Sequence, residues 1–349
     1  MLSTLYAAVA RRRRERYAAR PDLRRRLRRP VISVGNLAVG GRGKTPLVAS
    51  IARELLAMGE RPAILSRGYA RTRPVDGVVV VRDAAGIRSD LDSAGDEPLM
   101  LARRLDGAAV LVSPDRYLAG CLAEHRFGAT VHVLDDGFQH LTLERDIDIL
   151  IIGRDDIANP VTLPAGRLRE PLDTCIAADL IVTADDDVEI DVAGMEMPMF
   201  RTRRTIGAPT GFTGGPGPFS FDRSAIVVGV AGIASPNRFF GDLRRAGYSV
   251  ADTMAFQDHH PFSTADVRRI CRRAAAAGAA AVLTTEKDFV RLLPHRPFPV
   301  PVGWVPLTME PDPPADFRHW LAGAVAAARD IMPEPEPRVS NPEPRAWSA

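Results

Sequence analysis

A glycine-rich segment near the N-terminus carries the clearest chemical signal in the sequence. Residues 31–34 predict a buried strand, and the turn that follows ends in Gly-Gly-Arg-Gly-Lys-Thr-Pro. The backbone N–H groups of such a turn can surround a polyphosphate, and the helix that opens behind it adds its positive end. Lys44 could reach the terminal phosphates of a nucleotide such as ATP, and Thr45 could ligate Mg²⁺. The pattern therefore predicts a nucleotide-phosphate site made of Gly40, Gly41, Arg42, Gly43, Lys44, Thr45 and Pro46.

This motif departs from the strict phosphate-loop pattern at one position, since Ala38 stands where that pattern has glycine. The alternative is an ordinary glycine-rich connection between strand and helix. Lysine usage favours the phosphate site, because only Lys44 and Lys287 are lysines among 46 basic residues. A chain that otherwise uses arginine has lysine where a compact ammonium group is needed.

Two carboxylates follow a second apolar run. Residues 131–135 predict a buried strand that ends in Asp135 and Asp136, and Gln139 and His140 come shortly after. In a phosphate-loop protein such an acidic pair holds the Mg²⁺ that bridges the phosphates. The alternative is that Asp-Asp-Gly only turns the chain.

Further acidic and histidine residues allow both a structural and a catalytic interpretation. Asp96 precedes an apolar helix, so it could cap that helix or act as the base that accepts a proton from an attacking hydroxyl. His259 and His260 follow Asp258, but no third ligand is spaced for a metal, so a histidine that orients an aspartate is favoured. Residues 285–288 (Thr-Glu-Lys-Asp) lack the spacing of a guanine-recognition motif.

The elements that must position these residues alternate between short β-branched runs and helical stretches, which is typical of a parallel α/β sheet. The first series predicts strands at 31–34, 63–66, 78–81, 110–113, 131–135, 147–152 and 180–183, with helices at 46–58, 97–105 and 116–127. The second predicts strands at 225–230, 249–254, 280–284 and 302–305, with helices at 236–246, 265–277 and 316–329. We expect a basic arm (1–29), a nucleotide-binding domain (30–200), a linker (201–222), a second lobe (223–331) and a disordered proline-rich tail (332–349).

Charge is distributed unevenly along the 349 residues. The first thirty carry eleven arginines against two acidic residues, whereas the remainder is mildly acidic. Leu2, Leu5, Tyr6 and Val9 share one helical face ahead of the arginines, which favours a helix at an anionic membrane surface. A solvated helix packed on its own domain and a nucleic-acid arm are the alternatives, and the acidic body disfavours the latter. Three scattered cysteines favour a reducing compartment.

Together these segments resemble the tetraacyldisaccharide 4′-kinase family of lipid A biosynthesis. The resemblance runs in order from about residue 31 to 290 and includes Leu65-Ser-Arg-Gly-Tyr69, Gly95-Asp-Glu-Pro98, Asp135-Asp-Gly-Phe-Gln-His140, Leu163-Pro-Ala-Gly-Arg-Leu-Arg-Glu-Pro171 and Asp258-His-His260. It implies a P-loop-containing α/β/α sandwich with a second, smaller α/β/α lobe joined by a β linker. The protein would be peripheral on the cytoplasmic face of the bacterial inner membrane. It would transfer the γ-phosphate of ATP to the 4′-hydroxyl of a tetraacylated glucosamine disaccharide 1-phosphate.

The resemblance also implies residue roles. Asp96 would be the general base, oriented by His259 or His260, and we prefer His260. Thr45, Asp135, Asp136 and Glu97 would serve the metal, with Lys44 on the phosphates. Candidates for substrate binding are Asn36, Arg67, Gln139, His140, Arg167 and Arg169.

Two other functional classes use similar phosphate loops. A membrane-recruited switch ATPase acting on a protein partner would have a lysine before the paired glycines, where this chain has Val39. A GTP-dependent metallochaperone is disfavoured because the guanine-recognition and metal-ligand motifs are missing. We expect an acylated disaccharide lipid and an anionic membrane surface as partners, with no nucleic acid and no obligate protein partner evident.

Overall fold

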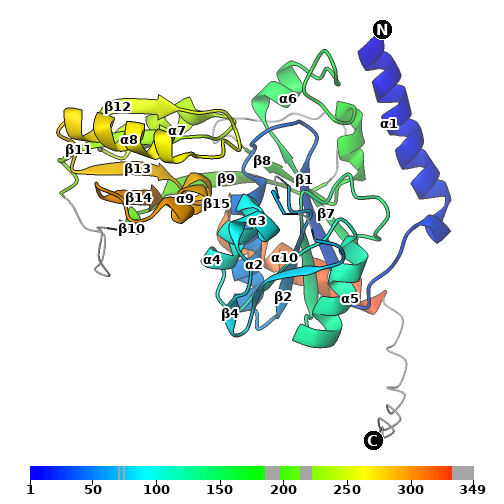
Figure 1. Ribbon diagram of the computed structural model, residues 1–349. Helices are drawn as coiled ribbons and strands as arrows, with labels where there is room; N and C mark the ends of the chain where they lie inside the picture. Colours follow the sequence, from blue (N-terminus) through cyan, green and yellow to red (C-terminus); the bar gives the residue numbers. More distant parts are fainter. Residues whose placement is uncertain (70, 74, 185–196, 213–221, 332–349) are drawn as a thin grey trace, which may run out of the picture.

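The protein is built on two β-sheets, each of which is covered by helices. The computed structural model describes residues 1–69, 71–73, 75–184, 197–212 and 222–331. The predicted tail, 332–349, lies outside the described residues. Figure 1 shows the smaller sheet beside the larger one, with the basic helix α1 (Leu2–Ala19) along the far side of the larger lobe.

The larger sheet has ten strands, and its centre is parallel. Strand β1, which leads into the glycine turn, lies between β6 and β7. Val34 of β1 is paired with Asp135 of β6, so the phosphate loop and the acidic pair emerge side by side at the carboxyl edge of the sheet. The strand order is β15 (Leu307–Asp312), β9 (Met199–Ile206), β8 (Leu180–Thr183), β7 (Ile147–Ile152), β1 (Val31–Asn36), β6 (Val131–Asp135), β2 (Pro62–Ser66), β5 (Ala109–Val112), β3 (Val79–Asp83) and β4 (Gly86–Ile87).

Helices cover both faces of this sheet. One face packs against α2 (Lys44–Ala57), α4 (Asp96–Arg104) and α10 (Pro314–Asp330), and the other packs against α5 (Arg116–Phe127). Shorter elements are η1 (Pro21–Leu23), α3 (Leu91–Ala94), α6 (Arg154–Ala158) and η2 (Leu172–Ala177). This arrangement confirms the predicted α/β/α sandwich.

The smaller sheet has five strands and its own apolar core. Its order is β10 (Thr210–Phe212), β14 (Val302–Val305), β13 (Ala281–Thr285), β11 (Ile226–Ala231) and β12 (Ser249–Ala255). Helices α8 (Thr264–Ala276) and α9 (Glu286–Leu292) pack on one face, and α7 (Pro236–Arg245) packs on the other. The turn η3 (Leu293–His295) follows α9. The second α/β/α lobe is therefore present as predicted.

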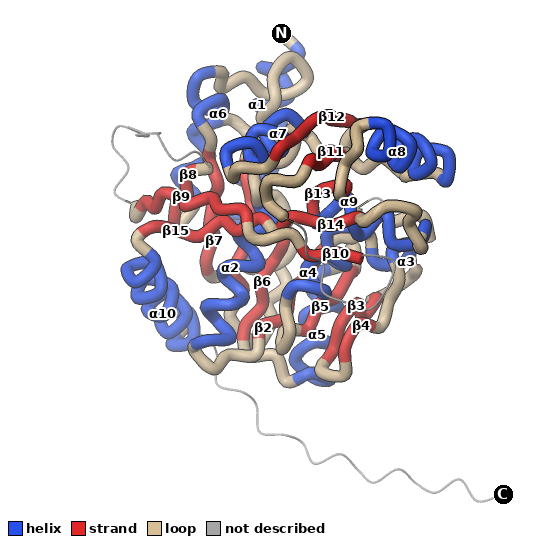
Figure 2. Tube along the Cα trace, turned by 90° about the vertical axis from the view of Figure 1, so that its left-hand side faces the viewer, coloured by secondary structure: helices blue, strands red, loops and turns tan. Residues whose placement is uncertain are grey.

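The structure corrects the predicted limits of that lobe. After β14 the chain returns to the larger sheet, where β15 pairs antiparallel with β9, and α10 buries Phe317, Leu321 and Val325 in the core of the first lobe. Figure 2 shows α10 next to α2, away from the smaller sheet. Residues 307–330 were expected in the second lobe, and residues 201–206 in the linker, but both belong to the larger sheet. Residues 213–221 of the predicted linker lie outside the described residues.

Candidate active site

The glycine turn has the backbone conformation that a phosphate loop needs. Gly40 and Gly43 have φ of 101° and 84°, values that side-chain-bearing residues rarely adopt. A Cβ on Gly43 would lie 2.0 Å from the sulfur of Met309. Helix α2 begins at Lys44, directly after Gly43, so its free N–H groups face the turn. The positive φ therefore favours glycine at Gly43, whereas the contact with the flexible end of Met309 could be relieved by movement of that side chain.

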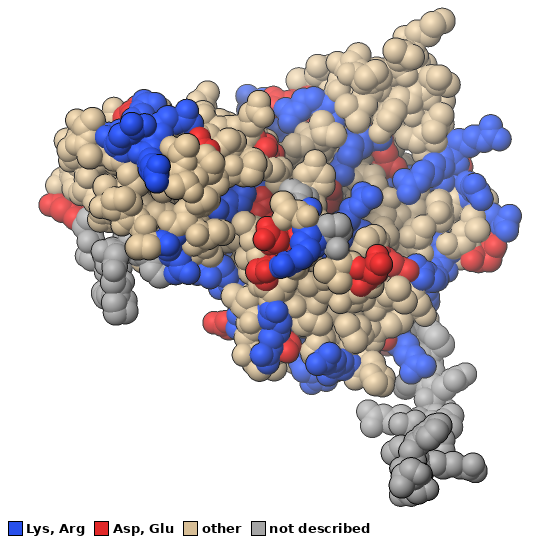
Figure 3. Space-filling model, viewed as in Figure 1, with Lys and Arg blue, Asp and Glu red and all other residues tan. Residues whose placement is uncertain are grey.

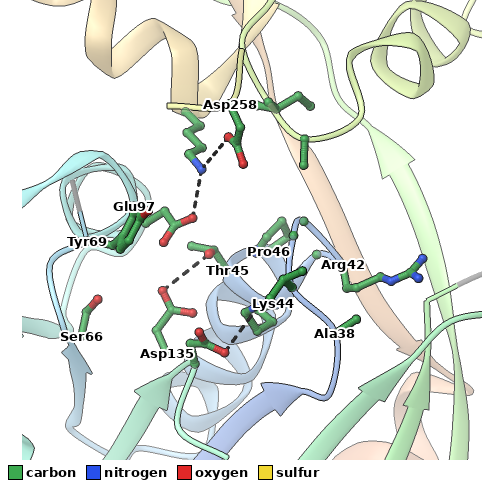
Figure 4. Close-up of a pocket in the computed structure, with 18 of the residues that line it drawn as sticks. Ala38, Arg42, Lys44, Thr45, Pro46, Ser66, Tyr69, Glu97, Asp135 and Asp258 are labelled. Carbon is green, nitrogen blue, oxygen red and sulfur yellow. Dashed lines mark hydrogen bonds and ion pairs between the residues drawn. The ribbon is translucent and has the colours of Figure 1, made fainter. Parts of the chain in front are cut away.

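The two residues at the start of α2 contact the acidic pair of β6. Lys44 Nζ donates to Asn36 Oδ1 at 2.8 Å and lies 3.5 Å from Asp136 Oδ1, and the hydroxyl of Thr45 lies 3.5 Å from Asp135 Oδ2. Figure 4 shows Lys44, Thr45 and Asp135 around the same space. The predicted phosphate and metal residues are thus brought together.

The surroundings shift the pKa values of the two adjacent carboxylates in opposite directions. Burial, with the negative charges of Glu97 and Asp136 nearby, raises the pKa of Asp135 to about 8. Burial also opposes the charge of Asp136, but Lys44 and Arg169 lower the pKa of Asp136 to about 2. An additional cation beside Asp135 would relieve this repulsion.

The oxygen ligands here fit a magnesium ion that is only partly held by protein. Among the described residues, no group of three or more His, Cys, Asp or Glu side chains is arranged to hold a metal. Thr45 and Asp135 offer oxygens, and Mg²⁺ typically binds through one or two carboxylates and completes its coordination with phosphates and water. Glu97 faces the same space but is paired with Lys287 at 3.1 Å.

The candidate substrate residues divide into those that face the cavity and those that do not. One cavity of about 1070 Å³ extends from α1 across the phosphate loop to the second lobe. Arg67, Gln139, His140 and Arg169 line it. Asn36 is fully buried beneath the loop and bonded by Lys44 and Arg169, while Arg167 donates to the carbonyl of Val39. Burial, with the charge of Arg116 nearby, lowers the pKa of His140 to about 4.

Arg42 has a structural contact inside the phosphate loop. Its guanidinium points toward α6, where it binds Asp156 at 2.7 Å and Asp155 at 3.3 Å, and Figure 4 shows it directed away from Lys44. Its side chain is therefore engaged away from the predicted phosphate position, and only its backbone N–H is available there.

Asp96 lies where the two lobes meet. Its Oδ2 is 2.9 Å from His259 Nδ1 and 3.4 Å from Arg291 Nε, and its Oδ1 accepts from the backbone N–H of Glu97. Burial opposes its charge, but the hydrogen bond from His259 and the charge of Lys287 hold the pKa of Asp96 below its ordinary value. Asp96 is not the N-cap that the capping interpretation expected, because Gly95 takes that place and Asp96 is the first helical residue, although its Oδ1 does satisfy one free N–H of the first turn.

The preference for His260 is wrong. His260 Nε2 pairs with Asp266 at 3.1 Å, and its ring packs against Phe256, so it serves the second lobe's own structure. His259, whose backbone has φ of 58°, contacts Asp96, and its side chain therefore lies on a different side from that of His260, which contacts Asp266. Asp136 and His259 are the two non-glycine residues with positive φ in the described chain, and such strain is concentrated at functional sites.

Sequence reasoning did not assign a role to Lys287, Arg291, Arg116 or Glu170. Lys287 contacts Glu97, Asp258 and His259, and these carboxylates together with that of Asp96 raise its pKa against the opposing effect of burial. Burial, with Arg67 nearby, lowers the pKa of Arg116 to about 10. The rarity of lysine was the available signal for Lys287.

The arginine-rich helix α1 rests on the body beside this cavity. Arg14 forms two hydrogen bonds with Glu170 and lies over the ring of Phe138, while Arg11 pairs with Asp173. Tyr6 and Val9 line the cavity. Leu2, Leu5 and Val9 are 70%, 64% and 61% exposed. In the described part of the chain, we find no helix with the length and apolar character needed to cross a membrane.

Comparisons with known proteins agree on one family. The profile of the tetraacyldisaccharide-1-P 4′-kinase family matches residues 1–326. A tetraacyldisaccharide 4′-kinase of Geobacter sulfurreducens is 42% identical over 329 residues, covering 91% of this chain and 90% of its own. The enzyme of the same name from Geobacter metallireducens is 41% identical over 298 residues, covering 84% and 88%. A crystal structure titled as an "apo" form of LpxK from Aquifex aeolicus in complex with ATP superposes with a TM-score of 0.75 at 30% identity, covering 93% and 97%. This chain belongs to the tetraacyldisaccharide 4′-kinase family.

Proposed function

We propose that this protein transfers the γ-phosphate of ATP to the 4′-hydroxyl of a tetraacylated glucosamine disaccharide 1-phosphate. The observation that carries the proposal is the arrangement around one cavity. Lys44, Thr45 and the acidic pair of β6 stand on one side, and the Asp96–His259 pair stands where the second lobe meets the first. Family membership and the ATP complex of the Aquifex aeolicus relative support the same reaction.

On the nucleotide side, the chain provides positive charge and fixed donors. The N–H groups of residues 40–45 and the ammonium of Lys44 would hold the β- and γ-phosphates. Thr45, Asp135 and Asp136 would hold Mg²⁺ with the phosphates, and Glu97 would join them after leaving Lys287. The magnesium ion would neutralise charge that develops on the transferred group and the leaving oxygen.

On the acceptor side, Asp96 would remove the hydroxyl proton. The 4′-oxygen forms a bond to the γ-phosphorus, the bond to the β-phosphate oxygen breaks, ADP leaves, and the proton passes to a carboxylate oxygen of Asp96. His259 would orient that carboxylate through its Nδ1. Asp96 is 3% exposed and does not line the cavity, so a neighbouring side chain must shift before the hydroxyl can reach it.

The polar part of the acceptor would bind between the loop and α1. Arg67, Gln139, His140 and Arg169 face this part of the cavity and would bind a phosphorylated sugar. Gln139 and Arg169 now donate to groups of the protein and would have to exchange some of those bonds for the substrate. Arg167 is a weaker candidate, because it is bonded to the loop carbonyl of Val39.

The acyl chains would remain in a membrane to which α1 binds. Moving an acyl chain into water costs about 0.8 kcal/mol per CH₂, so the enzyme must approach the bilayer. The exposed Leu2, Leu5 and Val9 support insertion at the lipid boundary, and the exposed Arg12 and Arg16 supply positive charge for anionic headgroups. Figure 3 shows the N-terminal end of the molecule as largely uncharged. We place the protein at the cytoplasmic face of the inner membrane, as a peripheral protein.

We further propose that the two lobes act as separate domains. Strands β9 and β15 are paired in the larger sheet, and each continues directly into a strand of the smaller one. They are therefore the segments about which the lobes would rotate to admit substrate.

A direct assay tests this function. The protein is incubated with labelled ATP, Mg²⁺ and a tetraacylated disaccharide 1-phosphate in anionic vesicles, and the position of the new phosphate is identified. Label at the 4′-oxygen supports the proposal. ATP hydrolysis that responds to a protein partner and never labels the lipid would contradict it and favour a switch ATPase.

A further inference from the structure

Lys287 occupies the junction between the lobes without a role in the reaction described above. It lies at the start of α9, and its side chain is 15% exposed. We propose that Lys287 is a positioning residue that fixes the tautomer of His259, so that the imidazole presents its N–H to Asp96. This inference rests on the proposed function of Asp96 and His259, but it concerns an arrangement that can be observed without any substrate.

The hydrogen-bond geometry around the ammonium group carries the inference. Nζ of Lys287 lies 3.1 Å from Glu97 Oε1, 3.3 Å from Asp258 Oδ1 and 3.0 Å from His259 Nε2. A lysine ammonium has three hydrogens and no acceptor. Each of these contacts takes one ammonium hydrogen, so Nε2 of His259 is an acceptor and carries a lone pair. The contact with Nε2 does not depend on Glu97, which would leave Lys287 for the metal.

The other ring nitrogen follows from this assignment. A neutral imidazole has one N–H, so if Nε2 accepts from Lys287 the hydrogen is on Nδ1. Nδ1 is 2.9 Å from Asp96 Oδ2. The ionised carboxylate of Asp96 can only accept hydrogen bonds, so Nδ1 must be the donor. In the opposite tautomer, the hydrogen on Nε2 would face the hydrogens of the Lys287 ammonium. The lone pair of Nδ1 would face the Asp96 carboxylate, so two acceptors would be in contact.

Lysine suits this position better than the arginine used almost everywhere else in the chain. The three acceptors come from α4 and from the loop after β12, and they converge on one point rather than along one edge. An ammonium is a compact charge that can bond in three directions, whereas a guanidinium presents its donors in a flat fork. Lys287 is one of only two lysines in the sequence.

The competing explanation is that Lys287 only holds the lobes together. The same pair of helices has a second ion pair, Arg104 with Glu286 at 3.4 Å, which does not touch His259. Glu286→Gln removes the negative charge of this ion pair from the same interface and is therefore a matched control. A structural role would give both variants the same effect, whereas a positioning role gives an effect only at Lys287.

The first measurement reads the tautomer directly. The full-length protein is labelled with ¹⁵N-histidine, and the ring signals of His259 are assigned by their loss in His259→Gln. In the wild type we expect Nδ1 protonated and Nε2 unprotonated, and the reverse overturns the proposal without any variant at Lys287. In Lys287→Met no ammonium faces Nε2, while Asp96 still requires the hydrogen on Nδ1, so we expect Nε2 to gain a proton and the ring to give the signals of an imidazolium. Glu286→Gln should keep the wild-type signals. Unchanged ring signals in Lys287→Met, or the same change in Glu286→Gln, also overturn the proposal.

The second measurement connects the tautomer to turnover. Groups that orient a metal-bound histidine typically contribute about 10- to 100-fold to activity, and we expect a contribution of similar size at His259. At saturating Mg²⁺ we expect Lys287→Met to lower kcat by about that factor while the KM values for ATP and lipid change less than about threefold. Adding Lys287→Met to His259→Gln should cause little further loss, because the lysine acts through the histidine. A full additional loss would contradict the inference.

The two proposals fail in different ways. If Asp96→Asn keeps full activity, the proposed base is wrong, whatever the spectrum of His259 shows. If Asp96→Asn is inactive but His259 gives the same ring signals with and without Lys287, the base assignment stands and the role of Lys287 is refuted.

Discussion

Replacing Arg14 by alanine should release helix α1 from the body of the protein while the two lobes stay folded. No residue of this helix is buried, so apolar packing contributes little to its position. Arg14 instead bonds Glu170 at 2.8 and 3.2 Å, donates to the carbonyl of Phe138 and lies 4.4 Å from the centre of that ring. The other ion pair of the helix, Arg11 with Asp173, is half-exposed at both ends and stabilises little. Ser3 also bonds Thr162 and Ala165, and Arg13 donates to the carbonyl of Gln139; these bonds are present in the variant too and do not change the difference between it and the wild type.

The size of the effect follows from the burial of the pair. The side chains of Arg14 and Glu170 are 18% and 5% exposed. Removing one partner of a buried pair costs about 3–5 kcal/mol, and the cation–π contact adds about 1 kcal/mol. Partial exposure and the remaining bond from Gln139 to Glu170 reduce this sum, so we expect about 2–3 kcal/mol. At about 1.4 kcal/mol per factor of ten, undocking of α1 should become about 30- to 150-fold more favourable.

Hydrogen exchange of the backbone amides in residues 5–16 measures this undocking. Arg12→Ala is the matched control, because it makes the same substitution in the same helix at an exposed side chain that forms no ion pair with the described part of the body. Arg14→Ala should speed exchange strongly, and Arg12→Ala only slightly. Because Tyr6 and Val9 line the cavity, Arg14→Ala should also raise the KM for lipid and not for ATP. Equal exchange in the two variants would refute the reasoning.

Three further predictions concern the loop and its acidic partners. Lys44→Met should lower kcat/KM by at least about 100-fold, because one donor to the transferred phosphate is lost. Circular dichroism should show that the variant keeps a native fold. Near-normal turnover would show that Lys44 has no part in the mechanism. Asp96→Asn should lower kcat by about 10²- to 10⁴-fold with an unchanged KM for ATP, and a loss of thermal stability alone would instead indicate a structural role. The third prediction is a pH dependence of stability, tested with Asp135→Asn. In the wild type, burial and the neighbouring carboxylates raise the pKa of Asp135 to about 8. The folded protein therefore keeps a proton on Asp135 that the unfolded chain releases near pH 4, and this protonation stabilises the fold. That stabilisation is complete below about pH 4 and is lost as the pH rises to about 8. The free energy of unfolding is measured with urea for both proteins, without metal or nucleotide. From about pH 4 to 8 the difference between Asp135→Asn and the wild type should grow in favour of the variant, by at most about 1.4 kcal/mol per pH unit. A difference that stays constant over this interval would contradict the prediction.

The parts of the fold that sequence predicts well are those with strong local patterns. The strand before the glycine turn, the helix after it and the strand that ends at Asp135 all lie within two residues of their predicted positions. Each combines an apolar run with a turn or helix-start signal. The adjacency of β1 and β6 also follows, since both end in residues that serve one site.

The strands that connect the lobes could not be predicted in the same way. Strand β9 contains Arg201, Thr202, Arg203, Arg204 and Thr205, so it lacks the apolar alternation that identifies a strand. Strand β15 contains Pro311 and lies at the sheet edge, where proline is tolerated. Strand β15 pairs with β9 across about a hundred residues of sequence, so β15 could not be assigned to the larger sheet, and α10 was placed in the wrong lobe.

The choice between His259 and His260 shows why adjacent residues are hard to separate. Both follow Asp258 and both are histidines, so composition and spacing are the same for each. What distinguishes them is a left-handed backbone at His259, with φ of 58°. His259 is the third residue of a turn that is closed by a hydrogen bond from the His260 N–H to the carbonyl of Gln257. The sequence does not show which of the two adjacent histidines takes that place in the turn.

The carboxylate of Glu170 connects helix α1, which would bind the membrane, with the phosphate loop, which would bind ATP. Oε2 of Glu170 accepts from both Arg14 and Gln139, at 2.8 and 3.2 Å. Gln139 donates in turn to the carbonyl of Asn36, whose side chain accepts from Lys44 at 2.8 Å. Every bond in this series joins groups that are at least half-buried, so the position of α1 relative to Lys44 is set by short polar contacts and not by apolar packing. The arginines of the N-terminal arm thus have two separate tasks. Those facing inward fix where the helix stands beside the cavity, and those facing outward remain available for an anionic surface.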